Sequence, residues 1–201
     1  MNRLHVQEVE VEEGGRFIRA IALPYNQEAF VIGPPRRGGE RVAHRERFDQ
    51  ESVMEVGAMF GKPILMSHDQ TRPTGRILLT KSTAEGLMIE GELLGSDDEL
   101  ESIRRRASGG VLSSVSVGFL PSPRDDEWSG PDKSGLPLVL RRRVILREIS
   151  LVLWPAFDGA RILKISQRTA AAMARKESSD KEIAAAMAVV AEAEAFLKRR
   201  R

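Results

Sequence analysis

The segment GRILLTKSTAEGLMIEGELL, residues 75–94, most strongly constrains the fold of this chain. It consists of two arms in which apolar and polar residues alternate, separated by a polar turn at Ser82–Gly86. Alternation with a period of two is typical of strands with one buried face, and two such arms around a short polar turn predict a β-hairpin. The middle of the chain is therefore predicted to be antiparallel β-structure.

Other segments extend this β-rich pattern. Residues 4–11 and the segment RFIRAIALPY (16–25) flank Gly14–Gly15 and predict a second hairpin. PILMSHD (63–69) predicts a strand that runs into His68, and LVLRRRVILREISLVLWPA (138–156) predicts a long β run. Many short strands with hairpin connections predict a mainly β domain with a few helices, folded as a closed or nearly closed antiparallel barrel.

Two helices and one loop are predicted between the strands. Residues 24–39 are rich in Gly, Pro and Arg and predict a mobile loop, and a short helix is predicted around Gln50–Phe60. Ser96 and Glu99 form a capping box that begins a second helix, which stops at Gly109–Gly110.

The composition changes after Ile165 and divides the chain into residues 1–165 and 166–201. The second part is rich in Ala, and its apolar residues recur at helical spacing. We predict an amphipathic helix that is separate from the barrel and packs against a partner or another copy of the chain. A C-terminal helix docked on the same domain fits the pattern equally well.

Composition excludes several classes of function. The 201 residues include 31 basic and 29 acidic side chains, and this near-balance argues against binding nucleic acid through bulk charge. The absence of cysteine excludes disulfides, cysteine–zinc sites and thiol catalysis. No apolar run approaches membrane-spanning length and the N-terminus is too charged for a signal peptide, so we expect a soluble intracellular protein. No spacing of ligands or glycines predicts a metal or cofactor.

The chain has three histidines, His5, His44 and His68. His5 lies in the first predicted strand and His44 in an Arg-rich segment, and both are most simply interpreted as surface residues. His68 ends an apolar strand, where a barrel places functional side chains at its rim. It is the better candidate for a general base, although a histidine in such a place is more often structural.

The segment VLSSVSVGFLP (111–121) contains the candidate nucleophiles. In a strand, Ser114, Ser116 and Gly118 share one face, while the intervening apolar residues point into the core. Small residues on the outer face leave room for a substrate, but a plain solvent-exposed face explains them as well. The segment lacks the Gly-x-Ser-x-Gly pattern of a nucleophile elbow.

The segment REISLVLWPA (147–156) adds a carboxylate. Glu148 and Ser150 share the more polar face of an otherwise apolar strand. Glu148 is either a partner for one of the nearby arginines or a carboxylate that orients a histidine.

Three segments in order resemble the prohead maturation proteases of tailed bacteriophages. That family shows a strand ending in a histidine, as in PILMSHD, and later a "G-x-L-x-x-x-S-x-G-F" strand, as in GGVLSSVSVGF (109–119). It closes with "E-[VI]-S-L-V-x-x-P-A", which REISLVLWPA follows closely. The resemblance covers about residues 16–165, and the family is related to the herpesvirus assemblin proteases.

The resemblance implies a seven-stranded, mainly antiparallel β-barrel of assemblin type with helices around it. It also implies a Ser-His-Glu triad, with Ser116 as the nucleophile, His68 as the general base and Glu148 in the orienting role. The backbone N–H groups near Ala156 and Phe157 are the implied oxyanion donors. Ser113 and Ser114 remain alternative nucleophiles, whereas Asp69 is a poor orienting residue because an extended chain points it away from His68.

The implied function is that of a serine endopeptidase that matures a phage or prophage procapsid without a cofactor. Its implied substrates are the major capsid protein, the scaffold protein and the protease itself, inside the procapsid in the host cytoplasm. The dimeric assemblins lead us to expect a homodimer. A catalytically inactive capsid-assembly or scaffold protein that keeps the barrel is the alternative, and a nucleic-acid-binding protein is weaker because aromatic residues make up only 5% of the chain.

Overall fold

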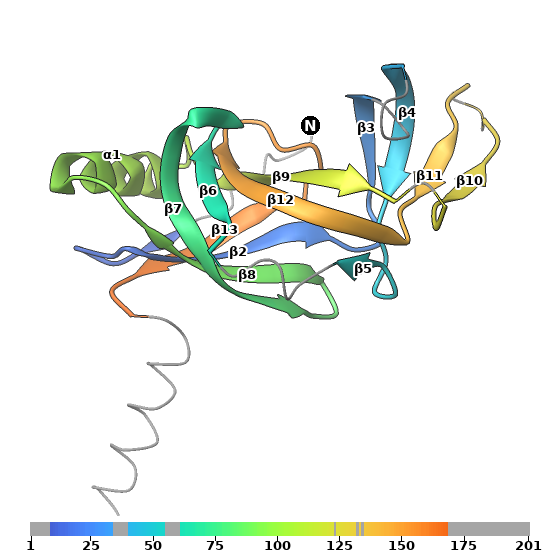
Figure 1. The fold of residues 1–201 in the computed structure, drawn as a ribbon. Helices are drawn as coiled ribbons and strands as arrows, with labels where there is room; N and C mark the ends of the chain where they lie inside the picture. The colour runs from blue at the N-terminus through green and yellow to red at the C-terminus, as the bar shows by residue number, and fades with distance from the viewer. Residues whose placement is uncertain are drawn as a thin grey trace, which may run out of the picture. The chain divides into compact units, whose positions relative to one another are not determined.

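A computed structural model describes residues 9–33, 40–54, 61–122, 124–131, 133 and 135–168, and it is mostly β-structure with one helix in that part of the chain (Figure 1). The strands are β1 (Glu10–Val11), β2 (Phe17–Pro24), β3 (Glu28–Gly33), β4 (Val42–Arg47), β5 (Val53–Met54), β6 (Pro63–Met66), β7 (Asp69–Ser82), β8 (Gly86–Leu93), β9 (Ser114–Pro121), β10 (Glu127–Ser129), β11 (Leu138–Leu140), β12 (Arg143–Val152) and β13 (Arg161–Ser166). The helix is α1 (Asp97–Ser108). The predicted C-terminal helix lies outside the described residues.

Seven strands close into a barrel. Going around it, the order is β13, β2, β8, β7, β6, β12 and β9, and the pairing of Arg161 with Ser114 joins β9 back to β13. The predicted seven-stranded barrel is therefore confirmed. The prediction of an antiparallel barrel is only partly right, because the barrel is mixed and β12 runs parallel to β6. The long stretch between these two strands lets the chain return in the same direction, which no hairpin does.

The interior of the barrel consists of aliphatic side chains from alternate positions of the strands. Fully buried examples are Ile18, Ile64, Ile77, Ile89, Ile149 and Leu151. In a barrel of this size the side chains fill the interior, so the residues between them point outward. The polar residues of β9 and β12 are therefore presented on the outer face.

The predicted hairpin of residues 75–94 is confirmed as β7 and β8, and the predicted capped helix is confirmed as α1. Ser96 Oγ accepts from Glu99 N–H while the Glu99 side chain accepts from Ser96 N–H, so both halves of the capping box are formed. The face of α1 with Leu100, Ile103 and Ala107 is buried. Within the described residues, no helix combines the length and apolar composition needed to cross a membrane.

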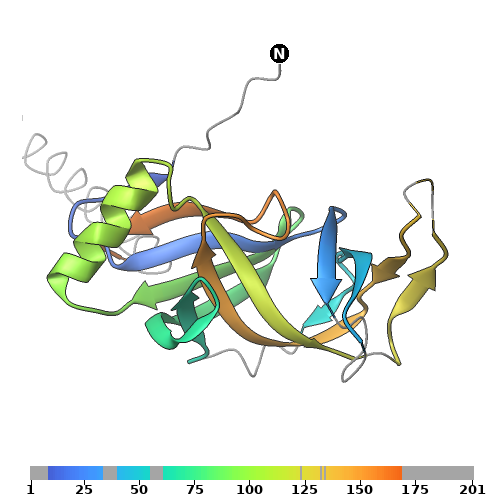
Figure 2. The same ribbon diagram turned by 90° about the horizontal axis from the view of Figure 1, so that it is seen from above.

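A second, four-stranded sheet in the order β10, β11, β4, β3 lies at the end of the barrel opposite to α1 (Figures 1 and 2). Its strand β4 pairs antiparallel with β3 and parallel with β11. Residues 28–33 therefore form a strand, where the sequence predicted a loop over 24–39, and residues 34–39 lie outside the described part.

Two further local predictions differ from what the described residues show. The first strand does not form a hairpin with β2, because β1 instead pairs parallel with β13. Of the predicted helix at 50–60, residues 55–60 lie outside the described part, and residues 50–54 form a turn followed by β5, which pairs parallel with β12. In both cases a long-range pairing with a strand late in the chain overrides a local pattern.

Candidate active site

His68 lies in a tight turn between β6 and β7. Ser67 and His68 both have positive φ, 55° and 60°, as the two central residues of a hairpin turn whose ends, Met66 and Asp69, are paired. Such a conformation costs roughly 1–3 kcal/mol per non-glycine residue and persists only where neighbours hold it. Here, Ser67 N–H donates to Leu151 O at 2.9 Å and His68 N–H donates to Ser150 Oγ at 2.9 Å.

The His68 imidazole is oriented by Glu148 on β12. Its Nδ1 donates to Glu148 Oε1 at 2.7 Å. The other carboxylate oxygen, Oε2, accepts from Ser150 Oγ at 2.7 Å. Ser150 is completely buried and thus joins the backbone of the His68 turn to the carboxylate that holds the ring. Because Nδ1 carries the proton, the neutral ring presents an unprotonated Nε2.

Gly118 leaves the space that the Glu148 side chain occupies. Gly118 on β9 is paired directly with Glu148 on β12. A Cβ atom built on Gly118 would overlap Glu148 Oε1, and it would also crowd the carboxyl carbon. The glycine of the Gly-Phe pair in this strand therefore has a physical role: it lets a carboxylate lie flat across the neighbouring strand.

The electrostatic surroundings favour a protonated His68. The hydrogen bond to Glu148 and the negative charge of that carboxylate raise the pKa of the His68 imidazole above its ordinary value of 6.5, while partial burial opposes the shift. The His68 side chain is 46% exposed, so its Nε2 edge is reachable from solvent. Among the described residues, no hydrogen bond uses Nε2.

Asp69, the neighbour of His68, has a different partner. Its Oδ1 accepts from both the backbone N–H and the hydroxyl of Thr71, at 2.9 and 2.6 Å. These hydrogen bonds lower the pKa of the Asp69 carboxyl. Asp69 therefore closes the turn locally and leaves the His68 ring to Glu148.

Ser116 lies on β9, on the outer face of the same wall of the barrel. Val115 is completely buried in the core, so Ser116 points the opposite way, as its position in the strand predicts. Ser116 is paired with Ser150, two pairs along the ladder from the Gly118–Glu148 pair. Directly opposite residues place their side chains on one face with Cα atoms about 5 Å apart, so Ser116 is a close neighbour of Ser150 and Glu148.

The structure brings His68 and Glu148 into direct contact, and it places Ser116 on the adjoining strand without a hydrogen bond to the ring. In the described ranges, the Ser116 hydroxyl has no hydrogen-bond partner, although the residue is only 7% exposed. Ser114 is paired with Val152, two residues further from the Gly118–Glu148 pair. Ser113 precedes the strand, and its carbonyl accepts from Ile162 N–H at 2.8 Å.

The loop with Ala156 and Phe157 connects β12 to β13. Both of its ends are fixed beside Ser114, which pairs with Val152 on one side and Arg161 on the other. The Phe157 ring is buried and packs against Phe48 with 5.8 Å between the ring centroids. The loop therefore runs close to the N-terminal end of β9, two residues before Ser116.

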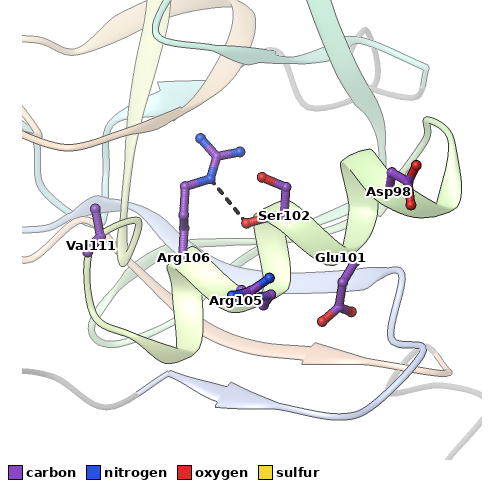
Figure 3. Close-up of a pocket in the computed structure, with 6 residues that line it drawn as sticks. All are labelled: Asp98, Glu101, Ser102, Arg105, Arg106 and Val111. Carbon is purple, nitrogen blue, oxygen red and sulfur yellow. Dashed lines mark hydrogen bonds between the residues drawn. The ribbon is translucent and has the colours of Figure 1, made fainter.

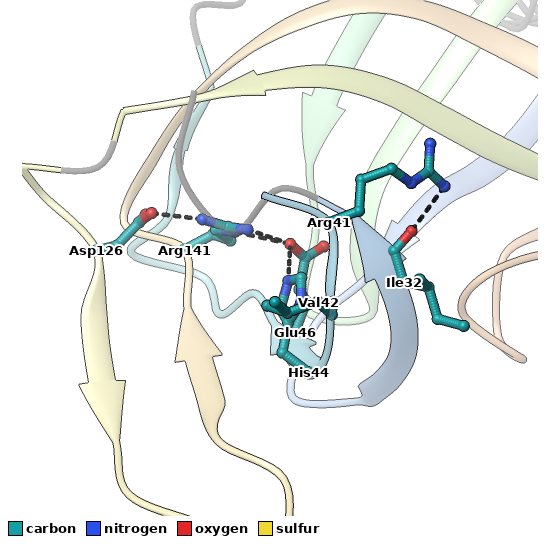
Figure 4. Close-up of polar contacts among 7 residues, drawn as sticks. All are labelled: Ile32, Arg41, Val42, His44, Glu46, Asp126 and Arg141. Atoms are coloured by element: carbon teal, nitrogen blue, oxygen red, sulfur yellow. Dashed lines mark hydrogen bonds and ion pairs between the residues drawn. The ribbon is translucent and has the colours of Figure 1, made fainter. Parts of the chain in front are cut away.

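A second histidine–glutamate pair lies in the small sheet (Figure 4). His44 Nε2 contacts Glu46 Oε1 at 3.0 Å and His44 Nδ1 contacts Val42 O at 3.0 Å. Both ring nitrogens thus face acceptors, and His44 is only 1% exposed. The prediction that His44 is a surface residue is wrong: β4 has one buried face, and His44 and Glu46 both lie on it.

Arg141 completes this buried cluster. Its Nε donates to Glu46 Oε1 at 3.0 Å, its Nη2 donates to the same oxygen, and its Nη1 donates to Asp126 Oδ2 at 2.5 Å (Figure 4). Burial raises the pKa of the Asp126 carboxyl, despite the nearby guanidinium. A buried network in which each member has a partner is typical of structural ion pairs that join elements, here β4, β10 and β11.

Within the described residues, neither the pocket beside α1 nor any cluster of acidic side chains offers a competing site. A pocket along the exposed face of α1 is lined by Asp98, Glu101, Ser102, Arg105, Arg106 and Val111, and within it Arg106 Nε donates to Ser102 O (Figure 3). None of the lining residues is a histidine that could activate the serine. Among all described residues, no group of three or more histidine and carboxylate side chains could hold a metal ion.

Comparison with known proteins supplies the family. The family model described as caudovirus prohead serine protease matches residues 2–176. The chain belongs to this family. No curated protein and no solved structure matches it. The family supports a prohead serine protease role, consistent with the resemblance of the three sequence segments.

Within this member of the family, the sequence did not single out Ser150. Its position two residues after Glu148 placed it on the correct face, and that was the available signal. Its two hydrogen bonds depend on the turn at Ser67–His68, which a strand prediction for PILMSHD did not include. The sharp turn moves His68 two residues beyond the end of β6.

Proposed function

We propose that this protein is the serine endopeptidase that matures the procapsid, with Ser116 as nucleophile, His68 as general base and Glu148 as the residue that orients His68. The observation that supports this most strongly is the Nδ1–Glu148 hydrogen bond, which leaves the accessible Nε2 of His68 free to take a proton. Ser116 is the serine of β9 nearest to the Gly118–Glu148 pair on that face.

The proposed reaction has two halves. Ser116 Oγ attacks the peptide carbonyl carbon and its proton passes to His68 Nε2. The tetrahedral intermediate collapses when the C–N bond breaks, and the amine leaves with the proton from Nε2. A water molecule then repeats the attack on the acyl ester, again losing its proton to Nε2, and Ser116 is regenerated.

The chain's own groups stabilise each step. The Glu148 carboxylate stabilises the imidazolium, and Ser150 and Gly118 fix where that carboxylate lies. The N–H groups of Ala156 and Phe157 are the proposed donors to the oxyanion, since their loop is fixed beside the start of β9. Reaching the attacking geometry requires Ser116 Oγ and the imidazole to approach each other, and catalytic hydrogen bonds often tighten only when substrate binds.

The proposed substrates are the major capsid protein and the scaffold protein inside the procapsid, in the host cytoplasm. Co-expression of the protease with the capsid protein tests the proposal. The wild type is expected to give shortened capsid protein, while Ser116→Ala and His68→Ala give none, a loss of at least about 10³-fold. Ser114→Ala is the matched control on the same face of β9 and is expected to retain processing. Processing that survives Ser116→Ala would favour the catalytically inactive alternative.

Self-processing is a separate part of the proposal. We expect cleavage within residues 166–201, because this Ala-rich segment differs in composition from the barrel domain of residues 1–165. Intact-mass measurement of the purified wild type and of Ser116→Ala tests it. A shorter wild-type chain is expected, and identical masses would contradict self-cleavage without affecting the triad.

A further inference from the structure

A pocket shares one wall with the proposed triad. It has a volume of about 370 Å³ and lies between β6, the first part of β7 and β12. Its lining consists of Lys62, Pro63, Leu65, Gln70, Pro73, Arg147 and Glu148. Because Glu148 also binds His68, a peptide in the catalytic site would pass directly beside this pocket.

The pocket opens on the same face of the sheet as Ser116. Leu65 on β6 is paired with Ser150, which is in turn paired with Ser116 on β9. Ile64 and Met66 belong to the core, so Leu65 points outward, as Ser150 and Ser116 do. Two strand spacings separate Leu65 from Ser116, roughly 10 Å, which an extended peptide covers in about three residues.

The pocket contains two cations that have no carboxylate partner among the described residues. Arg142 and Arg143 at the start of β12 form ion pairs with Asp49 and Asp125, respectively. In contrast, Arg147 and Lys62 form no ion pair with any described residue. Glu148, the one acidic group among the described lining residues, already accepts hydrogen bonds from His68 and Ser150. The pocket therefore has an excess of positive charge.

Arg147 reaches the pocket because of a β-bulge. The pairing of β12 with β9 shifts between Leu146 and Glu148, so Arg147 is the extra residue and has no partner on β9. Bulges redirect side chains and are frequent beside active sites. The guanidinium is suited to bind a carboxylate through two parallel hydrogen bonds, and the prolines and Leu65 offer an apolar wall for a methylene stem.

We propose that this pocket binds a carboxylate of the peptide substrate about three residues from the cleaved bond, with Arg147 as the main binding group and Lys62 assisting it. This inference rests on the proposed protease function. A glutamate side chain fits best, because its methylene groups contact the apolar wall while its carboxylate reaches Arg147. A free C-terminal carboxylate has the same chemistry and is the other source.

The test uses tiled peptides of the co-expressed major capsid protein, N-acetylated and C-amidated. Each peptide is made with its native glutamates and with Gln in their place, and a second set has a free C-terminus. For the wild type we expect about tenfold lower kcat/KM when one glutamate within four residues of the cleaved bond becomes Gln. If the free C-terminus alone gives the preference, the carboxylate source is the chain end.

Variants assign the preference to the pocket. Arg147→Ala is expected to cleave the Glu and Gln peptides equally, and Arg147→Glu to prefer a peptide with Lys at the same position. Arg143→Ala is the matched control, since Arg143 lies on the same strand with its own carboxylate partner. A Glu preference that survives Arg147→Ala, or equal cleavage of all peptides by the wild type, would overturn the inference.

A binding measurement separates this inference from the proposed function. Ser116→Ala is expected to bind the preferred Glu peptide about tenfold more tightly than its Gln counterpart, measured by calorimetry. If the wild type cleaves no capsid or scaffold peptide, the protease proposal fails, and this comparison alone decides the pocket. Equal affinities of the tiled Glu and Gln peptides would then reject it.

Discussion

Two histidine–glutamate pairs in this protein have similar hydrogen bonds and very different surroundings. In the His68–Glu148 pair, one ring nitrogen faces the carboxylate, the other has no hydrogen-bond partner among the described residues, and the side chain is 46% exposed. In the His44–Glu46 pair, both ring nitrogens face acceptors and the side chain is 1% exposed. A histidine can act as a general base only through a nitrogen that a substrate or nucleophile can reach, so only the first pair is suited to catalysis.

The acidic partners differ in the same way. Glu148 accepts hydrogen bonds from the hydroxyl of Ser150 and from His68, and it forms no ion pair with an arginine or lysine among the described residues. Glu46 also binds the Arg141 guanidinium, which in turn binds Asp126. The buried pair is thus one part of an ion network that joins strands of the small sheet, and its contribution is to the structure.

Replacing each histidine by alanine gives the largest expected difference. His68→Ala is expected to lower kcat/KM for capsid peptides by at least about 10³-fold, because the general base is lost, with little change in Tm. His44→Ala is expected to leave Glu46 and Arg141 imperfectly paired, at a cost of about 3 kcal/mol and a fall in Tm of about 10 °C. Peptide kinetics and thermal unfolding on both variants measure this. Loss of activity in folded His44→Ala protein, or unchanged activity in His68→Ala, would contradict the assignment of catalysis to the His68–Glu148 pair alone.

Gly118→Ala tests whether the space under Glu148 matters. The added Cβ would displace the carboxylate, so we expect a loss of about 10²-fold in kcat, since a shift of about 1 Å has that effect. Gly130→Ala is the matched control, because a Cβ at that position would meet no described atom within 4 Å beyond its own chain neighbours. Equal activities of the two variants would show that the position of Glu148 is not critical.

Ser150→Ala tests the connection between the His68 turn and Glu148. Removing the hydroxyl deprives Glu148 Oε2 of a donor and His68 N–H of an acceptor, and we expect kcat to fall about 10- to 100-fold with KM nearly unchanged. Ser166→Ala serves as the control. It removes another buried hydroxyl, which donates to Phe17 O on β2. A matching fall in Tm for both, with equal kcat, would indicate a structural role alone.

The smallest expected effect is on pH dependence. Glu148 raises the pKa of His68, and the base must be neutral, so kcat/KM should fall as the pH drops through a value above 6.5. Glu148→Gln removes the negative charge and lowers that pKa, so the acid limb of the residual activity should move to lower pH. Rate profiles between about pH 5 and pH 9 measure the shift. An acid limb at the same pH in Glu148→Gln as in the wild type would mean that a group other than His68 titrates there.

Much of the fold follows from local patterns in the sequence. The β7–β8 hairpin and α1 were predictable because alternation, turn residues and a capping box act over a few residues. The parallel pairing of β12 with β6 and β5 was not, because no local signal specifies which distant strand becomes a neighbour. The small sheet was not predicted for the same reason, because β4 pairs with β11, which lies far away in the sequence.

In the candidate site, too, only the features that follow from local pattern could be predicted. Parity along β9 and β12 correctly placed Ser116, Glu148 and Ser150 on one outer face. Turns with two positive φ values usually contain glycine or asparagine. The segment PILMSHD contains neither, so its sequence does not indicate the turn at Ser67–His68. His44 was misjudged because charged neighbours in RVAHRERF hide the fact that alternate residues of β4 are buried.

Labelling with a fluorophosphonate tests most directly whether Ser116 is a nucleophile activated by His68. Attack of Ser116 Oγ on phosphorus expels fluoride while His68 takes the proton, and the stable adduct is located by peptide mass mapping. The account predicts one adduct per chain, on Ser116, present in His44→Ala and absent in His68→Ala. An adduct on Ser113 or Ser114, labelling that His68→Ala does not reduce, or no labelling of the active wild type would contradict it.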